Sequence, residues 1–144
     1  MQNNDMTDPY NLKRFIDAQN PVYEHVLAEL RDGDKTSHWM WFIFPQIEGL
    51  GRSDTAKKFA ISSRREAEAY LHHPVLGTRL RECIRLVNQV EGRSAEDIFG
   101  HLDSLKFHSS LTLFVHTTPD NEVFQKAMQK YYKGEFDRST LERL

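Results

Sequence analysis

The sequence predicts an all-α fold: a compact single domain of about seven to nine short helices that does not form a regular bundle. Apolar residues recur at helical spacing along most of the 144-residue chain. Capping residues, glycines and prolines stand where such helices would start and stop. Apolar and polar residues do not alternate convincingly over the length of a strand, and no Asn-Gly or Asp-Gly turn joins two apolar runs.

Two helices are expected ahead of an aromatic segment. Residues 1–7 are polar and are expected to form a flexible N-terminus, so that the helical domain spans 8–144. Asp8-Pro9 and Asn20-Pro21 each combine a capping side chain with a proline that suits the first turn of a helix. Gly33 is expected to end the second helix.

The segment 37–53 is the centre around which the chain is organised. Its apolar run, 39–44, contains both tryptophans of the protein. A short helix that is apolar nearly all round should be surrounded by other elements. Pro45 lacks an N–H and disfavours helix at the preceding residue, so this helix should end at Phe44. A polar loop with two glycines follows.

Four further helical segments follow, each opened by a capping signal: Ser53, Ser63 with Glu66, His73-Pro74, and Ser94. The one after His73-Pro74 has the strongest periodicity, and Gly92 is expected to end it.

The C-terminal part predicts a long helix and two shorter ones. Asp103 or Ser104 would cap the long helix, and the β-branched residues within 115–118 leave a strand there as the alternative. The next helix closes at Gly134, and Asp137 caps the last one.

Composition excludes several classes of function. Hydrophobic residues make up 39% of the chain and charged residues 28%, as in soluble globular proteins. The net charge of −2 predicts neither general nucleic-acid binding nor attraction to anionic membranes. Without a signal peptide at its start or a run long enough for a membrane span, the chain is expected to be cytoplasmic. Cys83 stands alone, so no intramolecular disulfide forms, and its helical spacing favours a place in the core.

Six stretches of the chain match a pattern shared with other proteins: 8–15, 37–46, 49–53, 73–77, 97–100 and 103–114. Together they resemble one bacterial family, catalogued as domain of unknown function 1810. The resemblance implies a small, mostly helical fold and no settled activity. Members are often labelled calpastatin, but calpastatins are disordered and this composition is that of a folded domain.

A second family is similar in the order of its features. NADAR proteins are helical N-glycosidases that act on ADP-ribose-linked substrates. An aromatic and histidine segment, a helix with alanine and lysine, and a late Lys-Phe helix follow the same order here, but no tryptophan follows Lys106 as that family's late Trp-Gly motif requires.

The loop before Ser53 is a candidate anion site. Gly51, Arg52 and Ser53 stand at an expected helix N-terminus, where free N–H groups and the helix dipole suit a phosphate or carboxylate. Arg52 could add a bidentate contact, and Lys57 lies one turn further on. In the alternative, the glycines satisfy turn geometry, Ser53 only caps, and Arg52 is solvated.

Two other clusters are candidates. Trp39 and Trp41 could form a wall on which a planar base stacks, with His38 as a general acid or base, or both indoles could belong to the core. Lys106, Ser109 and Ser110 share a helical face that could line an anion or sugar pocket. Alternatively, the two serines allow close helix packing.

Two hypotheses follow. In the first, these residues converge on a cleft that binds a phosphorylated, nucleotide-like or ADP-ribose-like molecule. Gln46 would bind a base or sugar there, and His38 or Glu48 would assist any glycosidic hydrolysis. In the second, the protein is a non-catalytic interaction module or a homo-oligomer, with Tyr131, Tyr132 and Phe136 as its exposed patch. The remaining histidines lack close ligand spacing, so no metal and no cofactor is expected.

Overall fold

Ten helices form from residues 8–144, the part of the chain that this computed structural model describes. The prediction for residues 1–7 lies outside that part. Among the described residues strand pairing is confined to an isolated bridge between Ile47 and Ile61, so the predicted all-α class is confirmed. The count is one above the predicted seven to nine, and four of the ten are short helices of four or five residues. The ten are α2 (Lys13–Gln19), α3 (Tyr23–Asp32), α4 (Met40–Ile43), α5 (Asp54–Lys58), α6 (Arg64–His72), α7 (Leu76–Gln89), α8 (Ala95–Phe99), α9 (His101–Val115), α10 (Glu122–Tyr132) and α11 (Arg138–Leu141).

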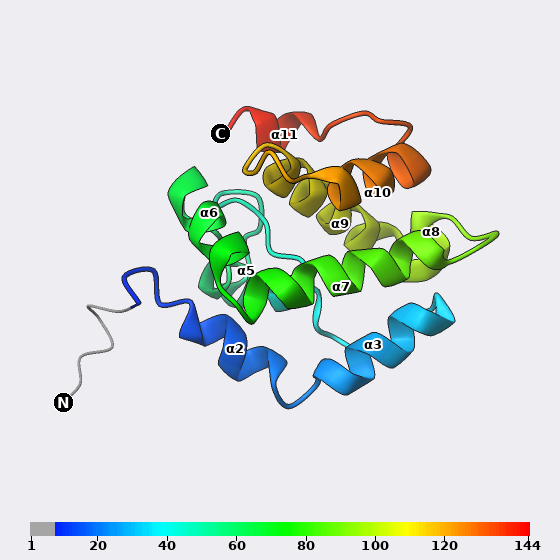
Figure 1. Ribbon diagram of the computed structural model, residues 1–144, viewed down its shortest axis with the longest axis horizontal. Coiled ribbons are helices and arrows are strands. Elements are labelled where there is room, and N and C mark those ends of the chain that lie inside the picture. The colour runs from blue at the N-terminus through cyan, green and yellow to red at the C-terminus, as the bar shows by residue number, and fades with distance from the viewer. Residues whose placement is uncertain (1–7) are drawn as a thin grey trace.

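Two long helices organise the packing. In Figure 1, α7 crosses the middle of the molecule, with α2 and α3 on one side and α9, α10 and α11 on the other. α7 packs against α3, α6 and α10, and α9 packs against α4, α6, α8, α10 and α11. Because these neighbours cross in different directions, the arrangement is not a regular bundle, as predicted.

A chain of aromatic rings connects four helices through the core. Phe15 of α2 contacts Tyr70 of α6, which contacts Phe114 of α9, which contacts Phe124 of α10, at centroid distances of 5.0, 5.5 and 6.1 Å. All four side chains are fully buried. Each such pair contributes roughly 0.5–1.5 kcal/mol beyond burial. The chain therefore joins the N-terminal helix to the late helices.

Four predicted caps are confirmed. Each accepts a backbone N–H from the first turn of its helix: Ser53 from Ala56, Ser63 from Glu66, Ser94 from Asp97 and Asp137 from Thr140. At Ser94 the contact is reciprocal and forms a complete capping box, because the carboxylate of Asp97 also accepts from the N–H of Ser94. At Ser63 the return contact is missing, because the carboxylate of Glu66 accepts from Ser62 and Arg14 instead.

Two predicted helix starts are wrong. Asp8 does accept from the N–H groups of Leu12 and Lys13, at 2.7 and 3.0 Å, but α2 begins at Lys13 rather than beside Pro9. Asn20 closes α2, its N–H donating to the carbonyl of Ile16, and α3 begins only at Tyr23. In both places the chain makes an intervening turn before the next helix.

The start and the end of α9 also differ from the prediction. α9 begins at His101, after Gly100 at φ 85°, so Asp103 and Ser104 lie inside its first turn. Asp103 does not cap the helix, and its carboxylate pairs with the side chains of Lys35 and Lys106 instead. The strand alternative over 115–118 is wrong, because α9 continues through Val115 and ends in a hydrogen-bonded turn at Thr117.

Glycine is required by geometry at two positions. Gly33 ends α3 at φ 66°, as predicted, in the left-handed region that favours glycine. At Gly77 an added Cβ would lie 2.0 Å from the carbonyl oxygen of Leu71. The start of α7 can therefore approach the end of α6 only because residue 77 has no side chain.

Candidate functional site

Trp39 lies in the core beside α4. Its side chain is 1% exposed, and its Nε1 donates to Oε1 of Glu29 at 2.9 Å. The same carboxylate accepts from the N–H groups of Thr36 and Ser37 and from the Ser37 hydroxyl. Burial raises the pKa of Glu29, but these hydrogen bonds outweigh it and lower that pKa to about 2. The indole of Trp39 is therefore enclosed by the protein and contributes to the stability of the fold. Its stacking role stays a prediction.

Trp41 is half-buried and lies against α9. Nζ of Lys106 is 5.1 Å from the centroid of its ring, within cation–π range. Lys106 also pairs with Asp103 at 3.0 Å, and Asp103 pairs with Lys35 at 2.7 Å. Burial raises the pKa of Asp103, but the hydrogen bonds from the two lysines outweigh it and lower that pKa. The fold thus brings together Trp41 and Lys106, two predicted ligand residues far apart in the sequence.

A small hollow lies beside Trp41, and Gln46 and Gly51 also line it. Its volume is about 10 Å³, roughly the space that one water molecule needs. At Gly51 an added Cβ would lie 2.4 Å from the Cβ of Ala56, so the loop packs tightly there. Three predicted ligand residues therefore share one hollow, which is too small for a nucleotide without rearrangement.

Four other predicted residues lie at the surface: His38, Glu48, Arg52 and Ser53. The hydroxyl of Ser53 accepts from the N–H of Ala56 as the cap of α5. Within the described residues, no hydrogen bond or ion pair joins the side chains of His38 and Glu48. Their catalytic roles, and the anion-binding role of Arg52, stay predictions.

The two serines of α9 are buried, with 6% of Ser109 and 2% of Ser110 exposed. The hydroxyl of Ser109 contacts the carbonyl of Leu105 and Oδ2 of Asp137, both at 3.1 Å. Since Asp137 caps α11, Ser109 connects α9 to α11, whereas Lys106 is directed to Trp41. Lys106 and Ser109, which the sequence places on one helical face, therefore contact two different parts of the protein, Trp41 and Asp137.

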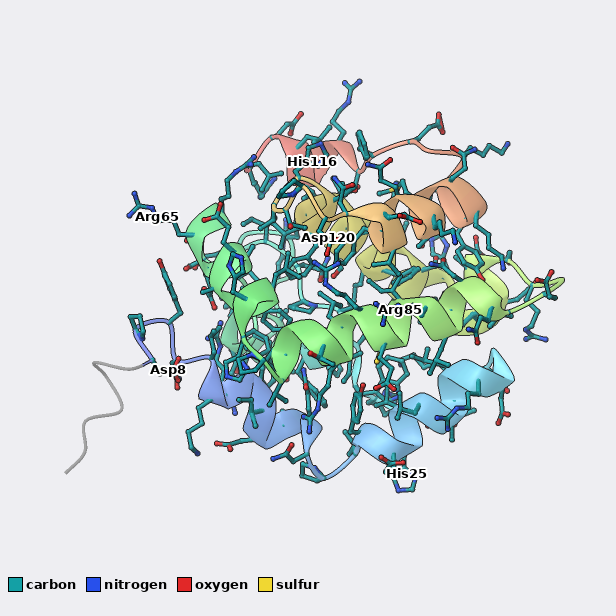
Figure 2. All side chains as sticks on the ribbon, in the orientation of Figure 1. Asp8, His25, Arg65, Arg85, His116 and Asp120 are labelled. Atoms are coloured by element: carbon teal, nitrogen blue, oxygen red, sulfur yellow. The ribbon has the colours of Figure 1, made fainter. Side chains whose placement is uncertain are left out.

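A much larger hollow of about 600 Å³ lies between α7 and α10. We call it the α7–α10 groove. It is lined from α7 by Arg81, Arg85, Asn88 and Gln89, from α10 by Glu122, Val123, Lys126 and Lys130, and by Asp120 just before α10. Figure 2 shows Arg85 on α7 and Asp120 close by on the same side of the molecule.

The cations of the α7–α10 groove differ in their partners. Arg81 donates to the carbonyl of Asp120 at 2.9 Å and lies 3.7 Å from its carboxylate. Lys130 donates to two carbonyl groups at the C-terminal end of α7. Arg85 and Lys126 are exposed, and neither side chain makes an ion pair or hydrogen bond with another described residue. Two positive charges are therefore available to an anion.

Asn88, one of the residues that line the groove, has an unsatisfied acceptor. Its Nδ2 donates to the carbonyl of Val123 at 3.2 Å. Its Oδ1 is buried and has no hydrogen-bond partner among the described residues. Because most buried polar atoms are hydrogen-bonded, this oxygen marks a place where a donor is missing.

Sequence reasoning missed the groove. Its signal is present as basic residues four apart on two helices, Arg81 with Arg85 and Lys126 with Lys130. Such spacing places both members of a pair on one face, but it is also common on solvated helix surfaces. Only the packing of α10 on α7 brings the two pairs together.

Three further observations concern the part of the chain that the structure describes. Among residues 8–144, no group of three or more His, Cys, Asp or Glu side chains could hold a metal ion. Cys83 is fully buried, as predicted, and burial raises its pKa to about 12, which leaves the thiol unreactive. No helix in the described part is long and apolar enough to cross a membrane.

Comparison with known proteins identifies the family but no activity. The family model described as "Protein of unknown function (DUF1810)" matches residues 9–144. The crystal structure of the conserved hypothetical protein Rv1873 from Mycobacterium tuberculosis is similar, with 55% sequence identity and a TM-score of 0.94. The match covers 95% of this chain and 98% of that one. No curated protein matches. The resemblance to domain of unknown function 1810 is confirmed, and the chain belongs to the DUF1810 family of proteins of unknown function.

Proposed function

We propose that this protein binds a small phosphorylated molecule and that the α7–α10 groove is its site. The observation that carries the proposal is the availability of Arg85 and Lys126 in a hollow of about 600 Å³. Ligand sites for small molecules typically measure about 300–1,000 Å³. A guanidinium can contact two phosphate oxygens at once, and a lysine adds a point charge.

The charge of the groove contrasts with that of the chain. Four basic and two acidic side chains line it, so its formal charge is 4 − 2 = +2, whereas the whole protein has −2. A local excess of positive charge in a concave surface raises the local concentration of anions. The groove supports a small anion better than a long nucleic acid, because the protein around it is acidic overall.

The test is calorimetric titration of the intact protein with inorganic phosphate, ribose 5-phosphate and AMP. We expect binding of at least one of them, weakened at least tenfold in Arg85→Gln/Lys126→Gln, since each charged hydrogen bond contributes about 1.5–3 kcal/mol. Absence of binding by all three at millimolar concentration, or equal affinity of the variant and the wild type, would overturn the proposal.

A matched variant addresses the site expected from the sequence. Arg52→Gln/Lys57→Gln removes the same number of charges from exposed positions, Arg52 just before α5 and Lys57 within it. Under our proposal it binds the same ligand with unchanged affinity. If this variant loses binding and the groove variant keeps it, the ligand sits in the loop before Ser53, and the first sequence hypothesis replaces the proposal.

A second candidate site is the surface at Trp41. It is favoured by the contact of Lys106 with the indole and by the hollow shared with Gln46. A planar anionic ligand would have to displace Lys106 or widen that hollow. Trp41→Leu tests this candidate, because it should weaken AMP binding only if the base stacks there.

The interaction-module alternative receives less support. Tyr131 and Tyr132 are half-buried, and their hydroxyls donate to the carbonyls of Val87 and Ser104. Phe136, at 43% exposed, is the accessible member of that expected patch. Sedimentation of the intact protein is the direct measurement, since a concentration-dependent dimer would favour this alternative.

A further inference from the structure

We infer that the α7–α10 groove recognises a sugar phosphate, and that a nucleobase contributes nothing to binding there. The inference rests on the proposed function and names the class of ligand for the same site. It follows from two properties of the groove lining: its mixture of hydrogen-bond acceptors with cations, and its lack of an aromatic side chain.

The groove lining combines cations with acceptors that the phosphate of a monoester cannot satisfy. A phosphate monoester dianion offers only acceptor oxygens, which suit Arg85 and Lys126. The groove lining also carries two carboxylates, those of Asp120 and Glu122, which accept hydrogen bonds and repel a phosphate. Inorganic phosphate has P–OH donors, but they belong to the same charged group that the carboxylates repel. The hydroxyl groups of a sugar can donate to a carboxylate while the phosphate stays with Arg85 and Lys126.

The groove also lacks the side chains that hold a base. Proteins usually bind bases by stacking them on aromatic rings. Val123 is the single large apolar side chain in the lining, and the ring of Phe124 beneath Arg81 is fully buried. A ligand with hydroxyl groups along its length and a phosphate at one end fits this lining better than a nucleotide does.

Matched ligands test the inference. AMP carries the same ribose 5-phosphate unit with an adenine base attached, so a comparison of AMP with ribose 5-phosphate tests the contribution of the base. Calorimetric titration should give ribose 5-phosphate at least a tenfold lower Kd than inorganic phosphate, and AMP a Kd no lower than that of ribose 5-phosphate. Glucose 6-phosphate serves as a second sugar phosphate and should also bind more tightly than inorganic phosphate.

Two variants should separate the two halves of the ligand. Glu122→Ala removes an acceptor and a negative charge, so it should weaken ribose 5-phosphate severalfold and strengthen inorganic phosphate. Arg85→Gln removes the phosphate contact and should weaken both ligands. Glu122 is exposed and lies in the first turn of α10, where a carboxylate favours the helix. Circular dichroism therefore checks that each variant keeps the wild-type helix content.

The outcomes distinguish this inference from the proposed function. Equal affinity for inorganic phosphate and ribose 5-phosphate would overturn the inference that the sugar contributes to binding, while leaving a phosphate site in the groove. A Kd for AMP tenfold below that of ribose 5-phosphate would overturn the exclusion of the base. Failure of every phosphate compound to bind would overturn the proposed function together with the inference.

Discussion

Arg14→Met should remove the ion pair that holds α2 against α6. Nη2 of Arg14 lies 2.8 Å from Oε2 of Glu66, and the two side chains are only 14% and 3% exposed. The guanidinium also donates to four backbone carbonyl groups, those of Tyr10, Asn11, Lys58 and Ala60. Methionine keeps an unbranched apolar stem next to Phe15 but makes none of these hydrogen bonds. The variant leaves the buried carboxylate of Glu66 without its counter-charge.

The expected loss is large for a domain of this size. Removing one partner of a buried ion pair typically costs about 3–5 kcal/mol, because the other charge stays desolvated. Small domains have a free energy of unfolding of about 5–15 kcal/mol in total. With a urea m-value of about 2 kcal/mol per M, the midpoint of unfolding should fall by roughly 2 M.

Urea denaturation followed by tryptophan fluorescence measures this directly, because Trp39 is buried in the same core. Lys13→Met is the matched control. It removes a cation from the neighbouring position of α2, where the pair with Asp17 is 61% and 58% exposed, and should change the free energy of unfolding by less than about 0.5 kcal/mol. A loss below about 1 kcal/mol for Arg14→Met, or equal losses for the two variants, would refute this account of the buried pair.

Two further predictions concern Glu29 and Gly77. The folded-state pKa of Glu29, about 2, lies below its ordinary value of 4.5, so its stabilising contribution is complete above pH 4.5 and is lost as the pH falls toward 2. After allowance for solvent screening this contribution is about 1 kcal/mol, and Tm measured from pH 6 to 2.5 should fall less steeply in Glu29→Gln than in the wild type. Gly77→Ala should cost about 2–3 kcal/mol, because its Cβ would overlap the Leu71 carbonyl; a Tm within 2 °C of the wild type would contradict this overlap.

Capping residues made much of the fold predictable from the sequence. Ser53, Ser63, Ser94 and Asp137 each accept a hydrogen bond where the pattern places a helix start. At Asp103 a residue of capping type lies inside α9, where it pairs with Lys106 one turn further on and with Lys35 from a distant segment, and these partners determine its role instead.

The candidate site was less predictable, because burial depends on packing between distant segments. Trp39 and Trp41 are two residues apart, yet the first is buried and the second half-exposed. Trp39 belongs to the hydrophobic core and donates to Glu29 of α3, whereas Trp41 lies at the edge of that core with Lys106 of α9 against its ring. Neither partner is recognisable from the local sequence.

The same dependence on packing supports the α7–α10 groove as a preorganised site. Lys130 and the hydroxyl of Tyr131, both on α10, donate to carbonyl groups in the last turn of α7 and just beyond it. A cation at that end of α7 is also favoured by the helix dipole. These contacts fix one helix against the other, so Arg85 and Lys126 project from two rigid elements rather than from a loop. A ligand that bridges them would need no rearrangement of the two helices, so the ordering cost on binding is confined to the side chains of Arg85 and Lys126 themselves.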